Sequence, residues 1–215
     1  MNPLAVNRID LVLFDLDDVL VDYRREVRCR TLGTRVGRSA DAVHAALFAS
    51  GLETASDLGR IDPAGVARQL SDALGVDISI EDCVAARAAA MTPIAEMPAL
   101  VSALAAHVPL AILTNNGTLV RDHFARLCPA FATFFDGRVH CSGLYGVAKP
   151  DPAVFAHCAD ALGIAPSRVL FVDDRAENAD GARAAGMQAH HFRTPALLRA
   201  ALSQFDLPKE HPHVH

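Results

Sequence analysis

Short apolar runs, each bounded by polar or turn-forming residues, recur along the chain. Three of them stand out, at residues 9–14, 109–113 and 169–172. Runs of this kind are typical of strands that are buried on both faces of a parallel sheet. Weaker strand patterns lie at 138–141 and 188–192. The pattern therefore predicts a sheet with three clear strands and two weaker candidates.

Helical patterns separate these runs. Residues 98–107 are rich in Ala and Leu, and the pattern at 178–185 ends before Gly186, a residue type that commonly follows the last helical position. The pattern at 151–162 opens with Asp151 as the N-cap, followed by a proline at the first helical position. Strands that alternate with helices indicate a doubly wound, Rossmann-like α/β fold with a parallel sheet.

One long stretch, residues 22–92, interrupts this alternation and contains no convincing strand. It contains several helix starts instead: Ser39, Asp62 with a following proline, and Ser79 with Asp82 in a capping-box pattern. About 70 residues is far more than one crossover helix requires. We therefore predict a small all-helical domain at 22–92, inserted into an α/β core made of 1–21 and 93–215.

The composition limits the possible partners. Of the 215 residues, 51% are hydrophobic, and the net charge of −5 with no basic stripe argues against nucleic acid. No apolar run reaches the roughly 18 residues needed to span a membrane, and residues 1–10 lack a secretory pattern. The five cysteines are widely spaced, without a zinc or redox motif. We expect a soluble, cytoplasmic protein with reduced thiols. The oligomeric state is not predicted.

The His-rich end of the sequence, residues 211–215, has two interpretations. It is a disordered terminus, or it is a segment that catches a metal ion.

Polar residues follow the apolar runs, at the positions where the predicted strands end. They are Asp15 and Asp17 after the first run, Thr114 and Asn115 after the second, Lys149 ahead of a helix, and Asp173 and Asp174 after the last clear run. Ligands of an open parallel sheet bind at the carboxyl ends of its strands. We therefore expect these side chains to face one crevice.

The residue types in this crevice indicate phosphate chemistry. Four carboxylates at one place repel each other unless a cation neutralises them, and Mg²⁺ is the usual cation beside phosphate. Lys149 and Thr114 are suited to bind phosphate oxygens. One carboxylate can attack phosphorus, and a second can protonate the leaving oxygen and then activate water. Each residue alone is a weak signal, and the order of all of them along the chain is what indicates the function.

That order resembles the haloacid dehalogenase-like hydrolase superfamily over essentially the whole chain. Residues 11–19 (LVLFDLDDV) match its first motif, hhhhDxDx[TV], and Thr114 matches the second motif, a Ser or Thr that ends a strand. Lys149 matches the third motif, and residues 171–174 (FVDD) match the acidic fourth motif. The run at 173–187 is also typical of the family.

The resemblance implies a role for each matched residue. Asp15 is expected to be the nucleophile and a Mg²⁺ ligand, and Asp17 the general acid/base whose backbone carbonyl also binds Mg²⁺. The other expected roles are phosphoryl binding by Thr114 and Lys149, a backbone N–H to the substrate from Asn115, Mg²⁺ binding by Asp174 with Asp173 close by, and orientation by Asn178.

The helical insert fits the position of the cap domain in this family. The chain looks closest to small sugar-phosphate phosphatases, in which a cap closes over the site and selects the substrate. The resemblance therefore implies a Mg²⁺-dependent phosphatase that hydrolyses a small phosphorylated metabolite, a sugar phosphate or similar, through an aspartyl-phosphate.

Several alternatives remain open from the sequence. A phosphomutase keeps both aspartates, whereas the dehalogenases of the family lack an acid at the position of Asp17. Outside this family, a phosphorylated signalling receiver would place its acidic pair first in the chain, and a binding module would normally have lost Asp15 or Asp17.

Two groups of residues near the first motif have no settled role. Asp18 stands where the family usually has glycine, and its role stays open. Residues 22–25, just after the first motif, either face the site or form a solvated helix face.

Overall fold

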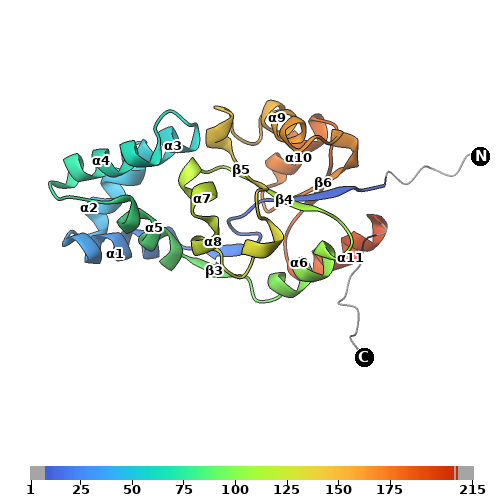
Figure 1. Cartoon of the computed structure of the whole chain (residues 1–215), viewed down its shortest axis with the longest axis horizontal. Coiled ribbons are helices and arrows are strands. Elements are labelled where there is room, and N and C mark those ends of the chain that lie inside the picture. The colour runs from blue at the N-terminus through green and yellow to red at the C-terminus, as the bar shows by residue number, and fades with distance from the viewer. Residues whose placement is uncertain (1–7, 206, 208–215) are drawn as a thin grey trace, which may run out of the picture.

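The computed structural model describes residues 8–205 and 207, and its centre is a five-stranded parallel sheet (Figure 1). The strand order is β5-β4-β1-β6-β7, and β1 pairs in parallel with both β4 and β6. The strands are β1 (Leu11–Phe14), β4 (Leu110–Thr114), β5 (Val139–Cys141), β6 (Val169–Asp173) and β7 (Gln188–His191). The predicted doubly wound fold is confirmed, and all five predicted strands are present.

Helices cover both faces of this sheet. They are α6 (Met97–Ala105) and α11 (Pro195–Leu202) on one face, and α9 (Pro152–Leu162) and α10 (Ala176–Ala184) on the other (Figure 1). Side chains alternate along a strand, so Val12 and Phe14 of β1 pack toward α6, whereas Leu11 and Leu13 pack toward α9. Each face thus has its own buried apolar layer.

The remaining elements after β4 lie between strands of the sheet, except the last one, which follows α11. They are the helices α7 (Thr118–Asp122) and α8 (Phe124–Leu127), and the short 3₁₀ turns η2 (Ala132–Phe134), η3 (Ser142–Leu144), η4 (Pro166–Arg168) and η5 (Ser203–Phe205). Of these, α8 and η3 lie beside the inserted helices.

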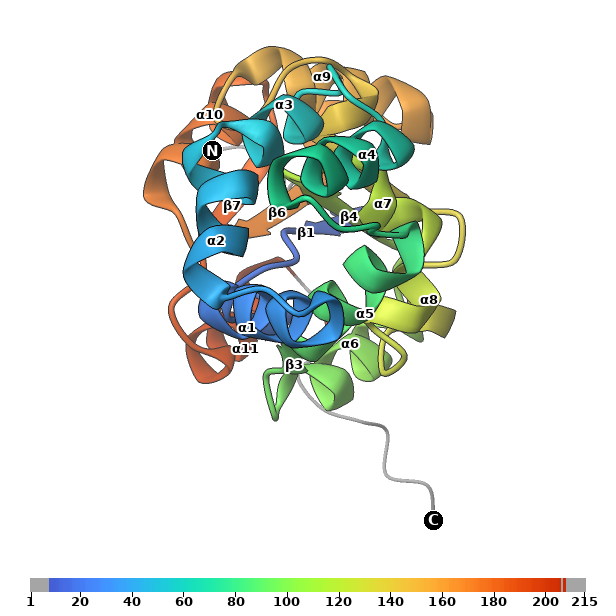
Figure 2. The ribbon, with the colours of Figure 1, turned by 90° about the vertical axis from the view of Figure 1, so that its left-hand side faces the viewer.

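The inserted segment forms a group of helices beyond the carboxyl ends of the strands, and we call this group the cap. Its elements are α1 (Arg25–Val36), α2 (Ala40–His44), which continues into a π-helical turn (Ala45–Ala49), α3 (Leu52–Asp57), α4 (Pro63–Leu74) and α5 (Ile80–Ala89). Figure 2 looks onto these helices, with the sheet behind them. The predicted N-caps Ser39 and Asp62 and the Ser79 capping box are all present.

The prediction of an all-helical insert without strands is wrong at both ends of the insert. Two strands, β2 (Val21–Tyr23) and β3 (Met91–Pro93), pair in antiparallel where the chain leaves and re-enters the core. Strands this short show no alternating pattern, and their pairing depends on the fold that brings the two ends together. Asp22 and Tyr23 therefore lie in a strand and not on a helix face. The domain boundaries at 21/22 and 92/93 stay a prediction, and both cut through this strand pair.

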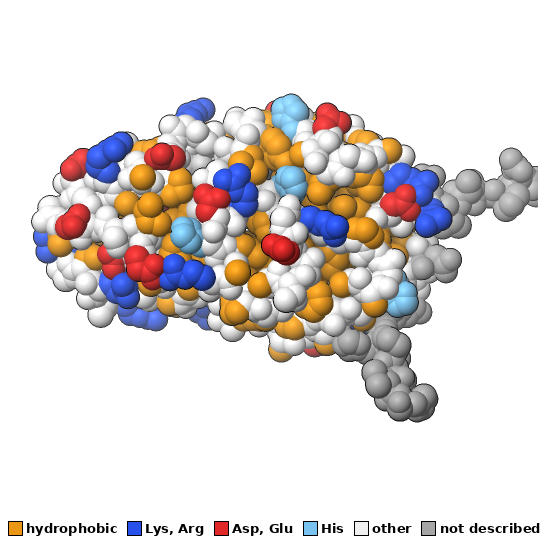
Figure 3. Space-filling model, viewed as in Figure 1, with side chains coloured by type: hydrophobic (Ala, Val, Ile, Leu, Met, Phe, Trp, Pro, Cys, Tyr) orange, Lys and Arg blue, Asp and Glu red, His pale blue; other side chains and the backbone are white. Residues whose placement is uncertain are grey.

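Other features of the described residues bear on the predicted class. All five cysteines are buried free thiols. Within residues 8–205, no helix combines the length and the apolar character that a membrane span requires. On the face shown in Figure 3, both signs of charge are interspersed. The predicted metal-binding or disordered tail at 211–215 lies outside the described residues.

Candidate active site

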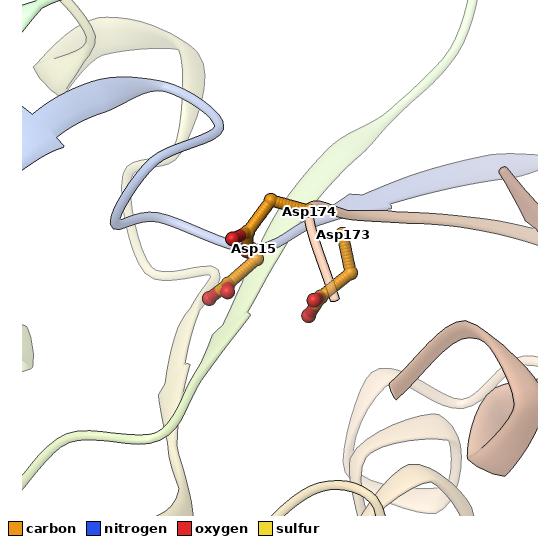
Figure 4. Close-up of side chains that lie close together, drawn as sticks. All are labelled: Asp15, Asp173 and Asp174. Carbon is orange, nitrogen blue, oxygen red and sulfur yellow. The ribbon is translucent and has the colours of Figure 1, made fainter. Parts of the chain in front are cut away.

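The carboxyl ends of β1 and β6 bring acidic residues together in one place. Asp15 directly follows β1, and Asp173 and Asp174 lie at the end of β6. One carboxylate oxygen from each of the three lies within 4.8 Å of the others, and Figure 4 shows the three side chains together. Such a set of hard oxygen donors suits a divalent cation such as Mg²⁺.

Lys149 places a positive charge against two of these carboxylates. Its Nζ lies 2.8 Å from Asp15 Oδ1 and 2.7 Å from Asp173 Oδ2, and its side chain is buried. The Asn115 side chain holds the Lys149 backbone, because its Nδ2 donates to the Lys149 carbonyl and its Oδ1 accepts from the Lys149 N–H, both at 2.9 Å. Asn115 thus positions the lysine. The sequence does not indicate this contact.

Burial makes the Asp15 carboxyl difficult to ionise in the absence of a metal. Desolvation raises its pKa to about 8, with Asp173 acting in the same direction and Lys149 opposing it. The Leu16 N–H donates to its Oδ1 at 2.7 Å. A cation bound at this site would favour the ionised form, so the donor set and its electrostatics both fit a metal ion.

The two acidic residues after β6 differ in their surroundings. The Asp173 carboxylate accepts hydrogen bonds from Lys149 Nζ, Asn178 Nδ2 and the Arg175 N–H. No other described residue donates a hydrogen bond to the Asp174 carboxylate, whose pKa is raised by burial and by Asp173. Asp174 is therefore free to bind a cation, whereas Asp173 also holds Lys149. The expected supporting role of Asn178 has a geometric basis in its contact with Asp173.

Asp17 is held from a different direction. Nη2 of Arg87, on cap helix α5, lies 2.9 and 2.6 Å from its two carboxylate oxygens, and Asn116 Nδ2 donates to it at 3.2 Å. Asn116 Nδ2 also lies 2.7 Å from Thr114 Oγ1, which links Asp17 to the end of β4. The Arg87 guanidinium stacks over the Tyr23 ring at 3.9 Å. The candidate acid/base is therefore bound by the cap.

Arg87 and Asn116 were not among the residues expected at the site. Arg87 stands in an Ala-rich helix and is only 2% exposed. In the sequence, the one feature that could have indicated it is that it is a single arginine among alanines. Asn116 lies two residues after Thr114 and could have been included with the second motif.

The backbone explains the residue at position 18. Asp18 has φ 62°, in the left-handed region where glycine is favoured and where Asp is tolerated better than most residues. Its N–H donates to the Val21 carbonyl at 2.6 Å, and its Oδ1 accepts weakly from the Tyr23 N–H at 3.4 Å. Asp18 thus forms the turn between the first motif and β2.

The cap packs directly against the core beside Asp17. Asp57, at the end of α3, accepts a hydrogen bond from the Gly117 N–H at 3.0 Å through Oδ1, and its carbonyl accepts from Ser142 Oγ at 2.6 Å. A Cβ on Gly117 would lie 2.2 Å from Ser56 Oγ and 3.1 Å from the Ser56 carbonyl oxygen, so this close approach favours glycine. A cavity of about 20 Å³ remains between cap and core. Its lining includes Arg28, Glu53, Asp57, Arg87, Asn116 and Gly117.

Comparison with known proteins accounts for this arrangement. The model of the haloacid dehalogenase-like hydrolase family matches residues 9–186, from the first strand to the end of α10. The chain belongs to the haloacid dehalogenase-like hydrolase family. The family match covers the strand ends, the cap and every residue expected at the site.

Two curated relatives of this hydrolase are named as phosphatases. Phosphatase MT3486 of Mycobacterium tuberculosis is 40% identical over 93 residues, which cover 43% of this chain and 42% of the relative. N-acylneuraminate-9-phosphatase of Rattus norvegicus is 32% identical over 100 residues, which cover 46% of this chain and 40% of the relative. The chain thus spans about two fifths of the length of each.

A solved structure shares the fold over most of both chains. A haloacid dehalogenase-family enzyme of Bacteroides thetaiotaomicron, solved in complex with magnesium and inorganic phosphate, superposes with a TM-score of 0.69 at 21% identity. The superposition covers 86% of this chain and 94% of the other.

Proposed function

We propose that this hydrolase is a Mg²⁺-dependent phosphatase that cleaves a small phosphorylated metabolite through an aspartyl-phosphate on Asp15. The observation that supports it most is that two neighbouring carboxylates have different partners. Asp15 lies beside Lys149 and two further acidic residues, whereas Asp17, two positions later, forms an ion pair with Arg87. The names of the relatives agree with this reaction, as does the magnesium and phosphate complex of the enzyme with the same fold.

In the first step, an oxygen of the Asp15 carboxylate attacks phosphorus, and the bond from phosphorus to the leaving oxygen breaks. Lys149 Nζ and Thr114 Oγ1 bind the phosphoryl oxygens, and Asp17 gives its proton to the leaving oxygen. Mg²⁺ held by Asp15, Asp174, Asp173 and the Asp17 carbonyl would neutralise the charge on the phosphoryl group. The products of this step are an alcohol and the phosphorylated Asp15.

In the second step, Asp17 accepts a proton from water as the water attacks phosphorus. The acyl-phosphate bond breaks, inorganic phosphate is released, and the Asp15 carboxylate is restored with Asp17 protonated again. This cycle uses one water and returns every catalytic group to its initial state. Asn115 supports it by holding the Lys149 backbone, and Asn178 by holding Asp173.

The cap favours a small substrate. It packs on the core where Asp57 accepts from the Gly117 N–H and leaves a cavity of only about 20 Å³ there, so a bulky polymer would have to displace α3 to enter between cap and core. A sugar phosphate or a similar metabolite fits this restriction, and one relative is named N-acylneuraminate-9-phosphatase. The five buried free thiols suit the reducing cytoplasm.

Product analysis with Mg²⁺ tests the proposal against its alternatives. A phosphatase releases inorganic phosphate from p-nitrophenyl phosphate and from an alkyl phosphate. A mutase moves the phosphoryl group to a second hydroxyl of the substrate, and a dehalogenase releases halide from a 2-haloacid. A receiver or a binding module turns over none of them. Halide release without phosphate release, or no turnover of any phosphate ester, would overturn the proposal.

A further inference from the structure

Asn116 lies between two residues of the proposed reaction. Its Nδ2 is 2.7 Å from Thr114 Oγ1, the expected phosphoryl-binding hydroxyl, and 3.2 Å from Oδ2 of Asp17, the expected acid/base. The residue is only 6% exposed, and its backbone carbonyl accepts from the Gly143 N–H at 3.2 Å. Asn116 is therefore held in place between the two groups, and the reaction steps given above assign it no role.

The neighbours of the Asn116 amide determine which way it faces. Nη2 of Arg87 lies 2.6 Å from Asp17 Oδ2, a contact that fits an ionised carboxylate. An ionised carboxylate only accepts hydrogen bonds, so the amide turns its nitrogen and not its oxygen toward Asp17. The nitrogen carries two N–H groups, and the second one donates to Thr114 Oγ1. Asp17 thus fixes the amide in the orientation that donates to Thr114.

The contact with Asn116 leaves the proton of the Thr114 hydroxyl unused. A hydroxyl has one O–H donor and two acceptor lone pairs. Thr114 Oγ1 accepts from Asn116, and its O–H makes no hydrogen bond to an acceptor among residues 8–205. Because Thr114 is buried, an O–H without an acceptor is unfavourable there. An oxygen of a phosphoryl group, which accepts hydrogen bonds, would satisfy it.

From this arrangement we propose that Asn116 is a positioning residue that makes the Thr114 hydroxyl a donor to the phosphoryl group, a role that rests on the proposed function. Because the amide N–H occupies one lone pair of Oγ1, the O–H turns away from the amide and is left for a phosphoryl oxygen. Without Asn116, the hydroxyl loses this constraint. Asn116 thus acts on the transferred group through Thr114, so its effect is the same for every leaving group.

The contacts of Arg87 distinguish this role from a role in acid catalysis. Arg87 Nη2 lies 2.9 and 2.6 Å from the two Asp17 oxygens, whereas Asn116 reaches only one of them, at 3.2 Å. Loss of the Asn116 amide therefore leaves Asp17 bound to Arg87. Thr114 Oγ1, in contrast, loses the one hydrogen bond that it makes within residues 8–205. We expect Asn116→Ala to act on Thr114 and to leave Asp17 in place.

A double-mutant cycle tests the proposal during Mg²⁺-dependent hydrolysis of p-nitrophenyl phosphate by the full chain. Thr114→Val removes the hydroxyl and keeps the shape of the side chain. It should lower kcat/KM about 10–100-fold, because a hydrogen bond to a charged phosphoryl group is a strong one. Asn116→Ala should lower kcat/KM about tenfold. Since Asn116 acts through the hydroxyl, the double variant should be at most about twofold worse than Thr114→Val alone.

Asn115→Ala is the matched control, because it makes the same truncation one residue earlier. The Asn115 side chain binds the Lys149 backbone, so its loss should multiply with that of Thr114→Val. With an alkyl phosphate, Asn116→Ala should lose the same factor as with p-nitrophenyl phosphate, unlike a variant that acts through the acid/base. Circular dichroism checks folding. If Asn116→Ala does not fold, Asn116→Leu repeats the cycle with a side chain of the same branching and no hydrogen-bonding group.

The outcomes separate the inference from the proposed function. No hydrolysis of p-nitrophenyl phosphate by the wild type with Mg²⁺ contradicts the function itself. Three results leave the function standing and overturn the inference: activity of Asn116→Ala within about twofold of wild type, a loss that multiplies with that of Thr114→Val, or a clearly larger loss with the alkyl phosphate. The last result would assign Asn116 to Asp17 instead of Thr114.

Discussion

Asp15 and Asp17 lie two residues apart, yet different regions of the molecule hold them. Lys149 reaches Asp15 from the core, and its own position depends on Asn115 and Asp173, which are also core residues. Arg87 reaches Asp17 from cap helix α5. An outward movement of the cap would therefore leave the surroundings of the nucleophile intact and take Arg87 away from the acid/base, which would keep only its contact with Asn116.

Because of this difference, we expect substitutions in the core and in the cap to affect activity in two different ways. Changes on the core side should reduce the reaction of every substrate equally, because they affect attack on phosphorus. Changes on the cap side should depend on the leaving group, because they affect the proton that it receives. The predictions below test this division, beginning with the largest expected effect.

Asp15→Asn should reduce kcat/KM by at least about 10³-fold for alkyl and nitrophenyl phosphates alike, about 4 kcal/mol of transition-state stabilisation. An amide cannot form the acyl-phosphate, whereas its shape fits the buried position and Lys149 keeps its contact with Asp173. Steady-state kinetics and circular dichroism check both points. A folded variant within tenfold of wild type would exclude Asp15 as the nucleophile.

Removal of the metal should abolish turnover, and Mg²⁺ should restore it and raise the Tm. A ligand that binds only the folded state stabilises it by about 2.7 kcal/mol when the free ligand concentration is 100 times the Kd.

Asp174→Ala should weaken Mg²⁺ binding more than Asp173→Ala, because the Asp173 oxygens already accept hydrogen bonds. In the presence of a chelator, Asp173→Ala should lower the Tm more than Asp174→Ala, because it removes one of the two carboxylates that pair with the buried Lys149. Titration calorimetry measures the Mg²⁺ affinity of each variant, and thermal melts measure its Tm. Weaker Mg²⁺ binding in Asp173→Ala than in Asp174→Ala would show that Asp173 is the main metal ligand.

Arg87→Ala should lower kcat/KM about 10–100-fold for an alkyl phosphate and only a few-fold for p-nitrophenyl phosphate. The general acid loses its orientation, and a nitrophenolate leaves without needing the proton. Arg35→Ala is the matched control, because Arg35 is a partly exposed cap arginine that pairs with Asp82. Equal losses on both substrates would mean that Arg87 acts on the core site or on folding.

Asp57→Asn should remove a pH-dependent contribution to the free energy of unfolding, which amounts to at most a few kcal/mol. The Asp57 carboxyl has a pKa of about 7 in the folded protein and an ordinary value near 3.8, so the folded state binds the proton more tightly. That stabilisation is complete below about pH 4 and is lost as the pH rises through 7. Between pH 5 and 8 in chelator, the Tm of Asp57→Asn should therefore fall less than that of wild type. Parallel Tm curves for the two proteins would contradict the raised pKa.

The sequence alone predicted the part of the molecule that local patterns determine. Buried strands such as 169–172 and helix caps such as Ser79 follow from apolar runs and short-range hydrogen bonding, and the strand ends carry Asp15, Thr114 and Asp173 to one edge. The pair β2 and β3 was missed because three residues carry no periodicity.

The contacts of the cap could not be predicted in the same way. Arg87 binds a residue 70 positions earlier, and that contact exists only because α5 packs against the strand ends. Asp57 has an ordinary sequence context, and its raised pKa comes from its burial where α3 of the cap packs on the core. Sequence patterns identify the residues of the reaction, whereas the residues that select and orient depend on how the cap packs on the core.

The most direct measurement of the central claim combines Asp17→Asn with p-nitrophenyl phosphate. The first step needs no acid with this substrate, while the second step loses its base, so the phosphorylated Asp15 should accumulate. We predict a burst of about one nitrophenolate per active site, a slow phase after it, and a phosphoryl group on the peptide that contains Asp15 after an acid quench. Steady turnover without a burst and with no phosphoryl group on that peptide, or a phosphoryl group on another peptide, would contradict the aspartyl-phosphate mechanism.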